Sequence, residues 1–217
     1  MQNVLISLEG VDACGKNTQS KKLEQHFIDR GDMVTRFELP DYDSVTGQML
    51  LGFLTGKWSA ALSVASREGL KGQYLDDIPG YVFHCVMIAN RLETLPNDLW
   101  GPPTGRVFIA DRYSASADAY GLALGIPLEF SRKLYRNIPS ADLNILLDIT
   151  LEESLKRRPD RRDNYEKNFD MLKRVRGHYQ DIFSTPDPSY VIVDASGTHD
   201  ETFAQILSAL ESINDLI

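Results

Sequence analysis

The sequence predicts an α/β fold: a three-layer α/β/α sandwich with a five-stranded parallel sheet. Three observations lead to it. Five short apolar or β-branched runs alternate with longer segments of helical periodicity, which is the pattern of repeated βαβ units. Hydrophobicity within several of these runs is continuous, as in strands that helices cover on both faces. Parallel strands joined by right-handed crossovers then give three layers.

Each element can be justified in chain order. The first run, "NVLISLE", leads into a glycine loop and a helix, and the second, "MVTRFEL", precedes a long helical region at 45–98. "LWGPPTG" and "STPDPS" carry the Gly and Pro residues typical of loops, and they precede the third and fifth runs. A basic cluster, "KRRPDRR", follows the fourth run. The predicted strands are 3–9, 33–39, 106–111, 143–149 and 190–195.

Length and composition fit a single domain over 1–217. Apolar residues make up 42% of the chain and charged residues 25%, and no apolar run approaches the roughly 18 residues of a membrane span. The first strand begins close to the first residue, which leaves no room for a signal peptide, so a cytoplasmic protein is expected. A net charge of -8 disfavours binding to a nucleic-acid polymer. Two cysteines are too few for a disulfide framework.

The glycine loop nearly matches the phosphate-binding pattern Gly-x-x-x-x-Gly-Lys-Ser/Thr. An apolar strand precedes it and a helix follows it, as the motif requires. In such a loop, backbone N–H groups and the positive end of the helix surround the phosphates, while the lysine reaches the β- and γ-oxygens. A plain glycine turn is the alternative. The expected ATP-binding residues are Gly10, Ala13, Cys14, Gly15, Lys16, Asn17 and Thr18.

Asn17 departs from the pattern, because a Ser or Thr hydroxyl normally binds Mg²⁺ at this position. Mg²⁺ is a hard cation that accepts carbonyl oxygens, so the Asn17 amide oxygen could replace the hydroxyl. Two interpretations follow: a working loop with altered metal geometry, or a loop that binds nucleotide without catalysis. The candidate metal ligands are Asn17, Asp12 and Asp111.

Five motifs, in order, resemble those of the thymidylate kinases, P-loop enzymes that move the γ-phosphate of ATP onto dTMP. They are "EGVDACGKNTQ" around the loop, "LPDY" at 39–42, "ANRLE" at 89–93, "DRYSAS" at 111–116 and "RDNYE" at 162–166. The resemblance covers nearly the whole chain. It implies a P-loop kinase fold, Mg²⁺ as cofactor, ATP and dTMP as substrates, and a homodimer.

Asp111 and Arg112 follow the third predicted strand at its carboxyl end, where open α/β sheets place their ligand sites. An arginine there can hold an acceptor phosphate with two hydrogen bonds, and a salt bridge to a neighbour is the alternative. Phosphoryl transfer depends on positioning and charge stabilisation, which Lys16, Arg112 and Mg²⁺ would supply. By resemblance, Asp12 lies between the substrates and orients the acceptor phosphate or the metal, unless it only forms a turn.

The basic cluster after the fourth predicted strand matches the position of a mobile lid in related kinases, so the resemblance implies a helical lid, a segment around 153–168 of the single domain. A lid that brings guanidinium groups to the transferring phosphoryl group also excludes water. Some thymidylate kinases carry a catalytic arginine in the phosphate loop, where this chain has an alanine, so the lid arginines are expected to take that role. A solvated basic face is the alternative. The candidates are Arg157, Arg158, Arg161 and Arg162, with the last two favoured; Tyr165 and Glu166 are expected to close over the deoxynucleotide.

The resemblance also assigns residues to the base and the sugar. Arg91 would donate to thymine O4, where cytosine carries a donor amine. One helical turn earlier the family usually stacks a Phe on the base, and this chain has Met87, whose thioether can pack against a ring. Tyr120 would close off the ribose 2′ position and Tyr42 would support the sugar, with ordinary packing as the alternative for both. Ser116 lies in the segment that contacts the nucleotide.

The resulting hypothesis is an ATP:dTMP phosphotransferase that makes dTDP by direct in-line transfer. A deoxynucleoside monophosphate kinase of broader specificity is one alternative, suggested by Met87 and by Ala117, which replaces a nucleotide-contacting Asn or Ser of the family. A nucleotide-binding protein with impaired catalysis is another, suggested by Asn17. A kinase acting on thymidine itself is a third, and the phosphate-binding Arg112 argues against it. The apolar stretch "YVFHCVMIA" at 81–89 would suit a dimer interface.

Overall fold

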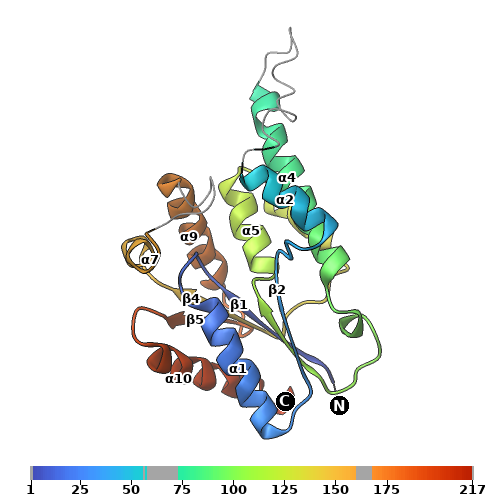
Figure 1. The fold of residues 1–217 in the computed structure, drawn as a ribbon, viewed down its shortest axis with the longest axis vertical. Helices are drawn as coiled ribbons and strands as arrows, with labels where there is room; N and C mark the ends of the chain where they lie inside the picture. Colours follow the sequence, from blue (N-terminus) through green and yellow to red (C-terminus); the bar gives the residue numbers. More distant parts are fainter. Residues whose placement is uncertain (1, 56, 58–72, 160–167, 217) are drawn as a thin grey trace.

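The computed structural model describes residues 2–55, 57, 73–159 and 168–216. Its strands form one parallel sheet in the order β2-β3-β1-β4-β5, which confirms the predicted fold class (Figure 1). Each strand begins and ends within one residue of its predicted bounds. The strands are β1 Val4–Glu9, β2 Val34–Glu38, β3 Val107–Asp111, β4 Leu143–Asp148 and β5 Tyr190–Asp194.

Helices connect the strands as the periodicity predicts. The predicted helical region 45–98 contains α2, α4 and a short 3₁₀ helix, η2. The α-helices with described bounds are α1 Lys16–Arg30, α2 Val45–Leu54, α4 Gln73–Thr94, α5 Ser114–Ala123, α6 Leu128–Tyr135, α7 Leu151–Arg157, α9 Phe169–Phe183 and α10 His199–Leu210. The 3₁₀ helices are η2 Asn97–Leu99 and η3 Glu211–Leu216.

Helices cover both faces of the sheet. On one face, Val4, Ile6 and Leu8 of β1 pack with residues of α1 and α10, including Ile206. On the other face, Leu146 of β4 packs against α5 and α9. Figure 1 shows α1 and α10 on one side of the sheet and α2, α4, α5 and α9 on the opposite side. Each fully buried aliphatic side chain stabilises this arrangement by about 1.5–3 kcal/mol.

The carboxyl ends of three neighbouring strands bring the candidate site together. In the sheet register, Asp111 at the end of β3 lies beside Leu8 of β1 and beside Glu38 of β2. The loops that follow these three strands therefore leave the same edge. In open α/β sheets this edge is where ligands bind.

The segment before α2 is fixed onto α4 by buried polar contacts. Asn90 of α4 is fully buried; its side chain accepts from the Asp41 N–H at 3.0 Å and donates to the Asp41 carbonyl at 3.1 Å. It also donates to the Ser44 hydroxyl at 2.9 Å. Glu93, one turn later, accepts from the Thr46 N–H at 3.0 Å at the start of α2. Because buried polar groups are costly unless they are paired, this set of contacts holds α2 in one place on α4.

The apolar stretch 81–89 packs largely within the chain itself. Phe83, Met87 and Ile88 are at most 8% exposed and pack with Leu50 and Leu54 of α2. These side chains belong to the protein's own core, whereas Val82, Cys85, Val86 and Ala89 remain at least partly exposed. A homodimer that uses this stretch stays a prediction. Among the described residues, no helix combines the length and the apolar character needed to cross a bilayer.

Replacing Gly47 of α2 by alanine is expected to lower the free energy of unfolding by about 3 kcal/mol. A Cβ at Gly47 would overlap the carbonyl oxygen of Asp41, so the segment before α2 would have to move. Urea denaturation measures the change. Gly177→Ala in α9 is the matched control, because a Cβ there meets no atom within 4 Å and alanine favours a helix by about 1 kcal/mol. Equal stabilities of the two variants would contradict the close approach at Gly47.

Candidate active site

The glycine loop between β1 and α1 takes backbone conformations that favour glycine. Gly10 and Gly15 have φ angles of 136° and 105°. A Cβ on Gly10 would lie 2.7 Å from the carbonyl oxygen of Leu147 in β4 and 2.9 Å from the Cys14 sulfur. Ala13 also lies in the left-handed region, with φ of 61°. The glycines of the predicted phosphate-binding pattern are therefore required by the path of the loop.

Lys16 begins α1 and folds back over the loop. Its ammonium group donates to the carbonyl oxygens of Gly10 at 3.1 Å and Val11 at 3.0 Å, and only 7% of the residue is exposed. Gly15 is the N-cap of α1; it offers no side chain to the first turn, which also lacks acidic residues. The positive end of the helix is therefore not neutralised by side chains of its own first turn, an arrangement that favours an anion at the loop.

Arg112 connects β3 to this loop. Its φ angle is 68°, and its guanidinium donates to the Gly10 carbonyl at 3.1 Å and to the Asp12 carboxylate at 2.5 Å. The guanidinium carbon also lies 5.6 Å from the centre of the Tyr120 ring, a cation–π contact. Burial opposes the charge on Asp12, but Arg112 and Lys16 outweigh burial and lower the pKa of Asp12. Asp12 and Arg112 thus form a charged pair between the loop and β3.

A cavity of about 920 Å³ opens over the loop and the start of α1, where the sequence predicts ATP, the phosphoryl donor. We call it the donor cavity. Residues 197–199, between β5 and α10, also line it. No sequence motif marked them; their place after the carboxyl end of β5 is the signal that could have found them. Of the predicted ATP-binding residues, Gly10 and Cys14 support the loop from within, and the cavity is lined by Ala13, Gly15, Lys16, Asn17 and Thr18.

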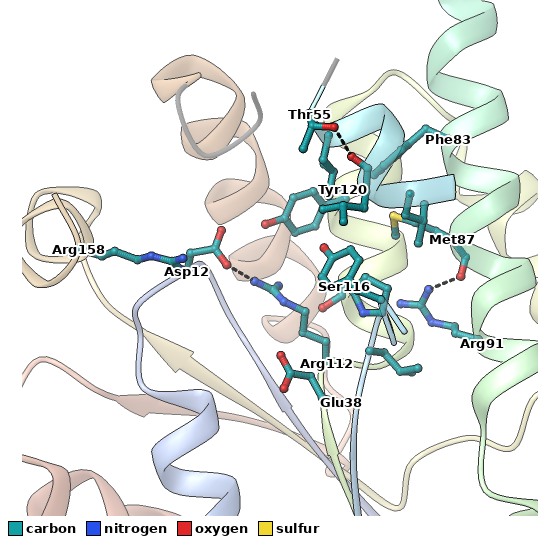
Figure 2. Close-up of a pocket in the computed structure, with 16 residues that line it drawn as sticks. Asp12, Glu38, Thr55, Phe83, Met87, Arg91, Arg112, Ser116, Tyr120 and Arg158 are labelled. Atoms are coloured by element: carbon teal, nitrogen blue, oxygen red, sulfur yellow. Dashed lines mark hydrogen bonds and ion pairs between the residues drawn. The ribbon is translucent and has the colours of Figure 1, made fainter. Parts of the chain in front are cut away.

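A second cavity, of about 340 Å³, lies between the carboxyl edge of the sheet and helices α2, α4 and α5 (Figure 2). We call it the acceptor cavity, because the sequence predicts the phosphoryl acceptor there. Phe83 and Met87 give it an apolar wall on α4, and both are mostly buried. Tyr42 and Tyr120 line it from the segment before α2 and from α5. Its size and its mixture of apolar and polar lining suit a small ligand with a ring. The predicted dTMP-binding residues of the described chain therefore surround one cavity.

Arg91 lies against this cavity and is only 4% exposed. Its guanidinium donates to the carbonyl oxygens of Met87 at 3.0 Å and Tyr113 at 2.7 Å. Its Nε atom has no hydrogen-bond partner within the described chain. Burial lowers the pKa of Arg91, and the nearby Glu9 carboxylate opposes that effect. A buried guanidinium beside an apolar wall can recognise a polar edge of a ring.

Ser116 lines the acceptor cavity, but its hydroxyl is engaged within the protein. The hydroxyl bonds to the carboxylate of Glu9 and lies 2.7 Å from the Tyr179 hydroxyl. Ser116 is 3% exposed, and Glu9 is fully buried. The predicted contact of Ser116 with a nucleotide therefore stays a prediction. Its main observed partner, Glu9, had no predicted role.

Four residues line both cavities: Asp12, Glu38, Arg112 and Arg158. Figure 2 shows Arg158 extending toward Asp12, which in turn is paired with Arg112. Glu38 ends β2, and no motif had marked it as a site residue. Ligands in the two cavities would meet at these four side chains. Two cations and two carboxylates at such a junction can position and balance anionic groups.

A sequence profile described as thymidylate kinase matches residues 8–206 of the chain. The chain belongs to the thymidylate kinase family. Thymidylate kinase of Arabidopsis thaliana is 29% identical over 205 residues, which are 94% of this chain and 70% of that protein. Thymidylate kinase of Schizosaccharomyces pombe is 26% identical over 213 residues, 97% of this chain and 92% of that protein.

Solved structures agree with this membership at the level of the fold. The structure of thymidylate kinase from Candida albicans matches all of this chain and 94% of its own, with a TM-score of 0.75 at 24% sequence identity. Thymidylate kinases are nucleoside monophosphate kinases that transfer phosphate from ATP to dTMP. In this family member, the donor and acceptor cavities correspond to two nucleotide-sized spaces on one sheet edge.

The lid expected of a thymidylate kinase is described only in part. Arg157, in α7, donates to the Glu153 carboxylate at 3.1 Å and to the carbonyl oxygens of Ala195 at 2.8 Å and Ser196 at 3.2 Å. It therefore ties α7 to the segment after β5, whereas Arg158 faces both cavities. The other residues predicted for the lid lie outside the described residues: Arg161, Arg162, Tyr165 and Glu166.

The donor cavity of this thymidylate kinase family member offers oxygen atoms suited to Mg²⁺. The three predicted ligands all line it: the carboxylates of Asp12 and Asp111 and the amide of the exposed Asn17. Within the described chain, no group of three or more His, Cys, Asp or Glu side chains could hold a metal alone. Mg²⁺ commonly binds through one or two carboxylates together with substrate phosphates and water. The residues therefore fit a metal that arrives with the nucleotide.

Gly10→Ala is expected to weaken ATP binding about tenfold or more, because the added Cβ would displace the loop from β4 and from Cys14. Isothermal titration calorimetry with a non-hydrolysable ATP analogue measures the affinity. Gly31→Ala is the matched control: Gly31, at the far end of α1, also has a positive φ, of 91°, but a Cβ there meets no atom within 4 Å. Unchanged affinity in Gly10→Ala would show that the loop does not hold the nucleotide.

Proposed function

We propose that this member of the thymidylate kinase family transfers the γ-phosphoryl group of ATP to dTMP and releases ADP and dTDP. The observation that carries the proposal is the meeting of the donor and acceptor cavities at Asp12, Glu38, Arg112 and Arg158. One cavity has the loop and helix end that bind phosphates, and the other has the apolar wall and buried arginine that suit a base. Nucleotides in the two cavities would face each other through their phosphates.

The donor half binds ATP through its phosphates. Lys16 is already held over the loop by the carbonyl oxygens of Gly10 and Val11. When β- and γ-phosphates occupy the loop, the ammonium exchanges these neutral partners for anionic oxygens, which are the stronger acceptors. Loop N–H groups and the start of α1 bind the remaining phosphate oxygens.

The acceptor half binds dTMP by its base and its phosphate. The thymine ring packs against Met87 and Phe83, and the Arg91 guanidinium donates to its O4 atom. Cytosine carries an amine at that position, so two hydrogen-bond donors, the amine and the Arg91 guanidinium, would face each other. Arg112, held beside the phosphate loop, binds the phosphate. Tyr42 and Tyr120 enclose the deoxyribose.

Transfer is direct and in line, from the donor phosphate to the acceptor phosphate. The contribution of the protein is to place the two groups and to stabilise the charge that spreads over the phosphoryl oxygens. Asp12, Asp111 and Asn17 would hold a Mg²⁺ ion that binds together with ATP, and this ion would supply further positive charge at those oxygens. Arg158 supplies a guanidinium from the lid segment, around 153–168, which shields the reaction from water. Arg161 and Arg162 keep their predicted place in that lid.

Two further properties go with this proposal. Cytoplasmic location and a homodimer are expected of the working enzyme. Within 81–89, Phe83, Met87 and Ile88 are buried in the protomer, whereas Val82, Cys85, Val86 and Ala89 remain at least partly exposed and could take part in a dimer interface. Sedimentation equilibrium of the purified protein measures the association state directly.

The substrate is tested by coupled ADP release across dTMP, dUMP, dCMP and dGMP. The expected kcat/KM for dTMP exceeds that for dUMP about tenfold, since one methyl group is lost from an apolar wall, and exceeds those for dCMP and dGMP by more. Lys16→Ala is expected to lower kcat by about 10²–10³, because a cation aimed at the transferring group is lost. Lys21→Ala, an exposed cation on the same helix, is the control. Comparable values for all four acceptors would exclude dTMP specificity.

Arg158→Ala is expected to lower kcat about 10²-fold or more while leaving both KM values nearly unchanged, because the guanidinium acts on the transferring phosphoryl group rather than on either base. Lys156→Ala is the matched control: Lys156 lies on α7, two residues earlier, with 77% of its side chain exposed. Steady-state kinetics with dTMP and ATP give both parameters. If the two variants had equal rates, Arg158 would have no part in the transfer.

A further inference from the structure

The buried acid Glu9 ends β1 next to the phosphate loop and makes an unusually complete set of contacts. One carboxylate oxygen accepts from the backbone N–H groups of Tyr113 at 2.8 Å and Ser116 at 3.2 Å. The other bonds to the Ser116 hydroxyl and accepts from the Tyr179 hydroxyl at 3.3 Å. Each oxygen thus has two donors, which is what a carboxylate without solvent contact requires.

These donors belong to the start of α5 and to α9. Tyr113, the N-cap of α5, offers no side-chain cap to its own helix, and the first turn has no acidic residue. Glu9 supplies the missing cap from β1, and its negative charge faces the positive end of the helix. Since α5 and β1 are separated by about a hundred residues in sequence, this contact fixes the helix to the strand that carries the loop.

Arg112 is the residue directly before this cap. Its backbone has the left-handed φ of 68°, and its N–H donates to the Leu8 carbonyl at 2.9 Å. Its guanidinium donates to the Tyr179 hydroxyl at 3.4 Å, the same hydroxyl that donates to Glu9. Arg112 is therefore linked to Glu9 in two ways. The residue that follows it, Tyr113, donates its backbone N–H to Glu9, and the Tyr179 hydroxyl bonds to both Arg112 and Glu9.

The positive charges of Arg112 and Arg91 favour the ionised form of Glu9. Burial raises the pKa of Glu9, while its hydrogen bonds and the nearby guanidinium groups of Arg112 and Arg91 oppose that rise. Burial also raises the pKa of Tyr179, so its hydroxyl keeps the proton that it donates. Arg112 and Arg91 line the acceptor cavity, whereas Glu9 does not, so its negative charge acts on the two arginines from outside the cavity.

We propose that Glu9 is a positioning residue for the acceptor phosphate: by capping α5 and sharing the Tyr179 hydroxyl with Arg112, it holds the Arg112 guanidinium in the orientation that binds this phosphate. Glu9 touches no substrate and acts through Arg112. The inference rests on the proposed function, because it takes the acceptor to be a nucleoside monophosphate.

Glu9→Gln tests it with little change of shape. The amide oxygen can still accept from the two N–H groups, and the amide nitrogen can donate to either hydroxyl, so the variant is expected to fold. Calorimetry is expected to show dTMP binding about tenfold weaker and ATP-analogue binding changed less than about twofold. Asp142→Asn is the matched control, since Asp142 accepts a backbone N–H from Leu5 at 2.8 Å before β4, at the opposite edge of the sheet.

A double-mutant cycle separates positioning from general support. In an Arg112→Lys background, Glu9→Gln is expected to weaken dTMP binding by less than about twofold, because the guanidinium it positions is gone. Full additivity, or equal weakening of dTMP and ATP-analogue binding, would overturn the proposal. Should Glu9→Gln not fold, Tyr179→Phe removes only the shared hydroxyl; selective weakening of dTMP binding is then expected, and unchanged dTMP affinity would overturn the proposal. Failure of the unaltered protein to bind dTMP would instead refute the proposed function.

Discussion

The contact of Arg112 with the phosphate loop is the constraint on which the site depends. Two phosphate groups can approach each other only where positive charge is concentrated and fixed in place. Arg112 comes from β3, the neighbour of β1 in the sheet, and its bonds to the Gly10 carbonyl and the Asp12 carboxylate hold it at the boundary between the two cavities. The left-handed backbone at this residue turns the side chain back over the sheet edge instead of along the strand. The side chains of Asp12, Tyr120 and Tyr179 all contact this guanidinium.

Two cations of the site, Lys16 and Arg91, are held by neutral groups that can be exchanged for substrate oxygens. Lys16 rests on two carbonyl oxygens, and Arg91 rests on two more. Neutral acceptors keep a side chain in place without cancelling its charge, so its field remains available to an arriving anion. Preorganisation of this kind reduces the ordering cost of binding and leaves little to rearrange during the reaction.

The sequence was most informative where one local pattern determines the structure. Continuous apolar runs identified all five strands, and the glycine spacing with Lys16 identified the loop, because both depend on neighbours in the chain. Glu38, Glu9 and residues 197–199 were missed as site residues, because their position depends on which strands are adjacent in the sheet. The motif "ANRLE" drew attention to Arg91 but not to the buried Asn90 within it, because the contacts of Asn90 with the segment before α2 join residues that are far apart in the sequence.

The packing of α2 on α4 separates the residues predicted to contact the base from the residues at the sheet edge that are predicted to contact the phosphates. Met87 and Arg91, which we propose contact the base, are on α4, whereas Lys16 and Arg112 lie at the carboxyl edge of the sheet. Because Asn90 and Glu93 join α2 and α4 into one unit, the two helices keep their places relative to each other. A substitution at Met87 would therefore alter the fit to the base while leaving the hydrogen bonds that hold Lys16 and Arg112 in place.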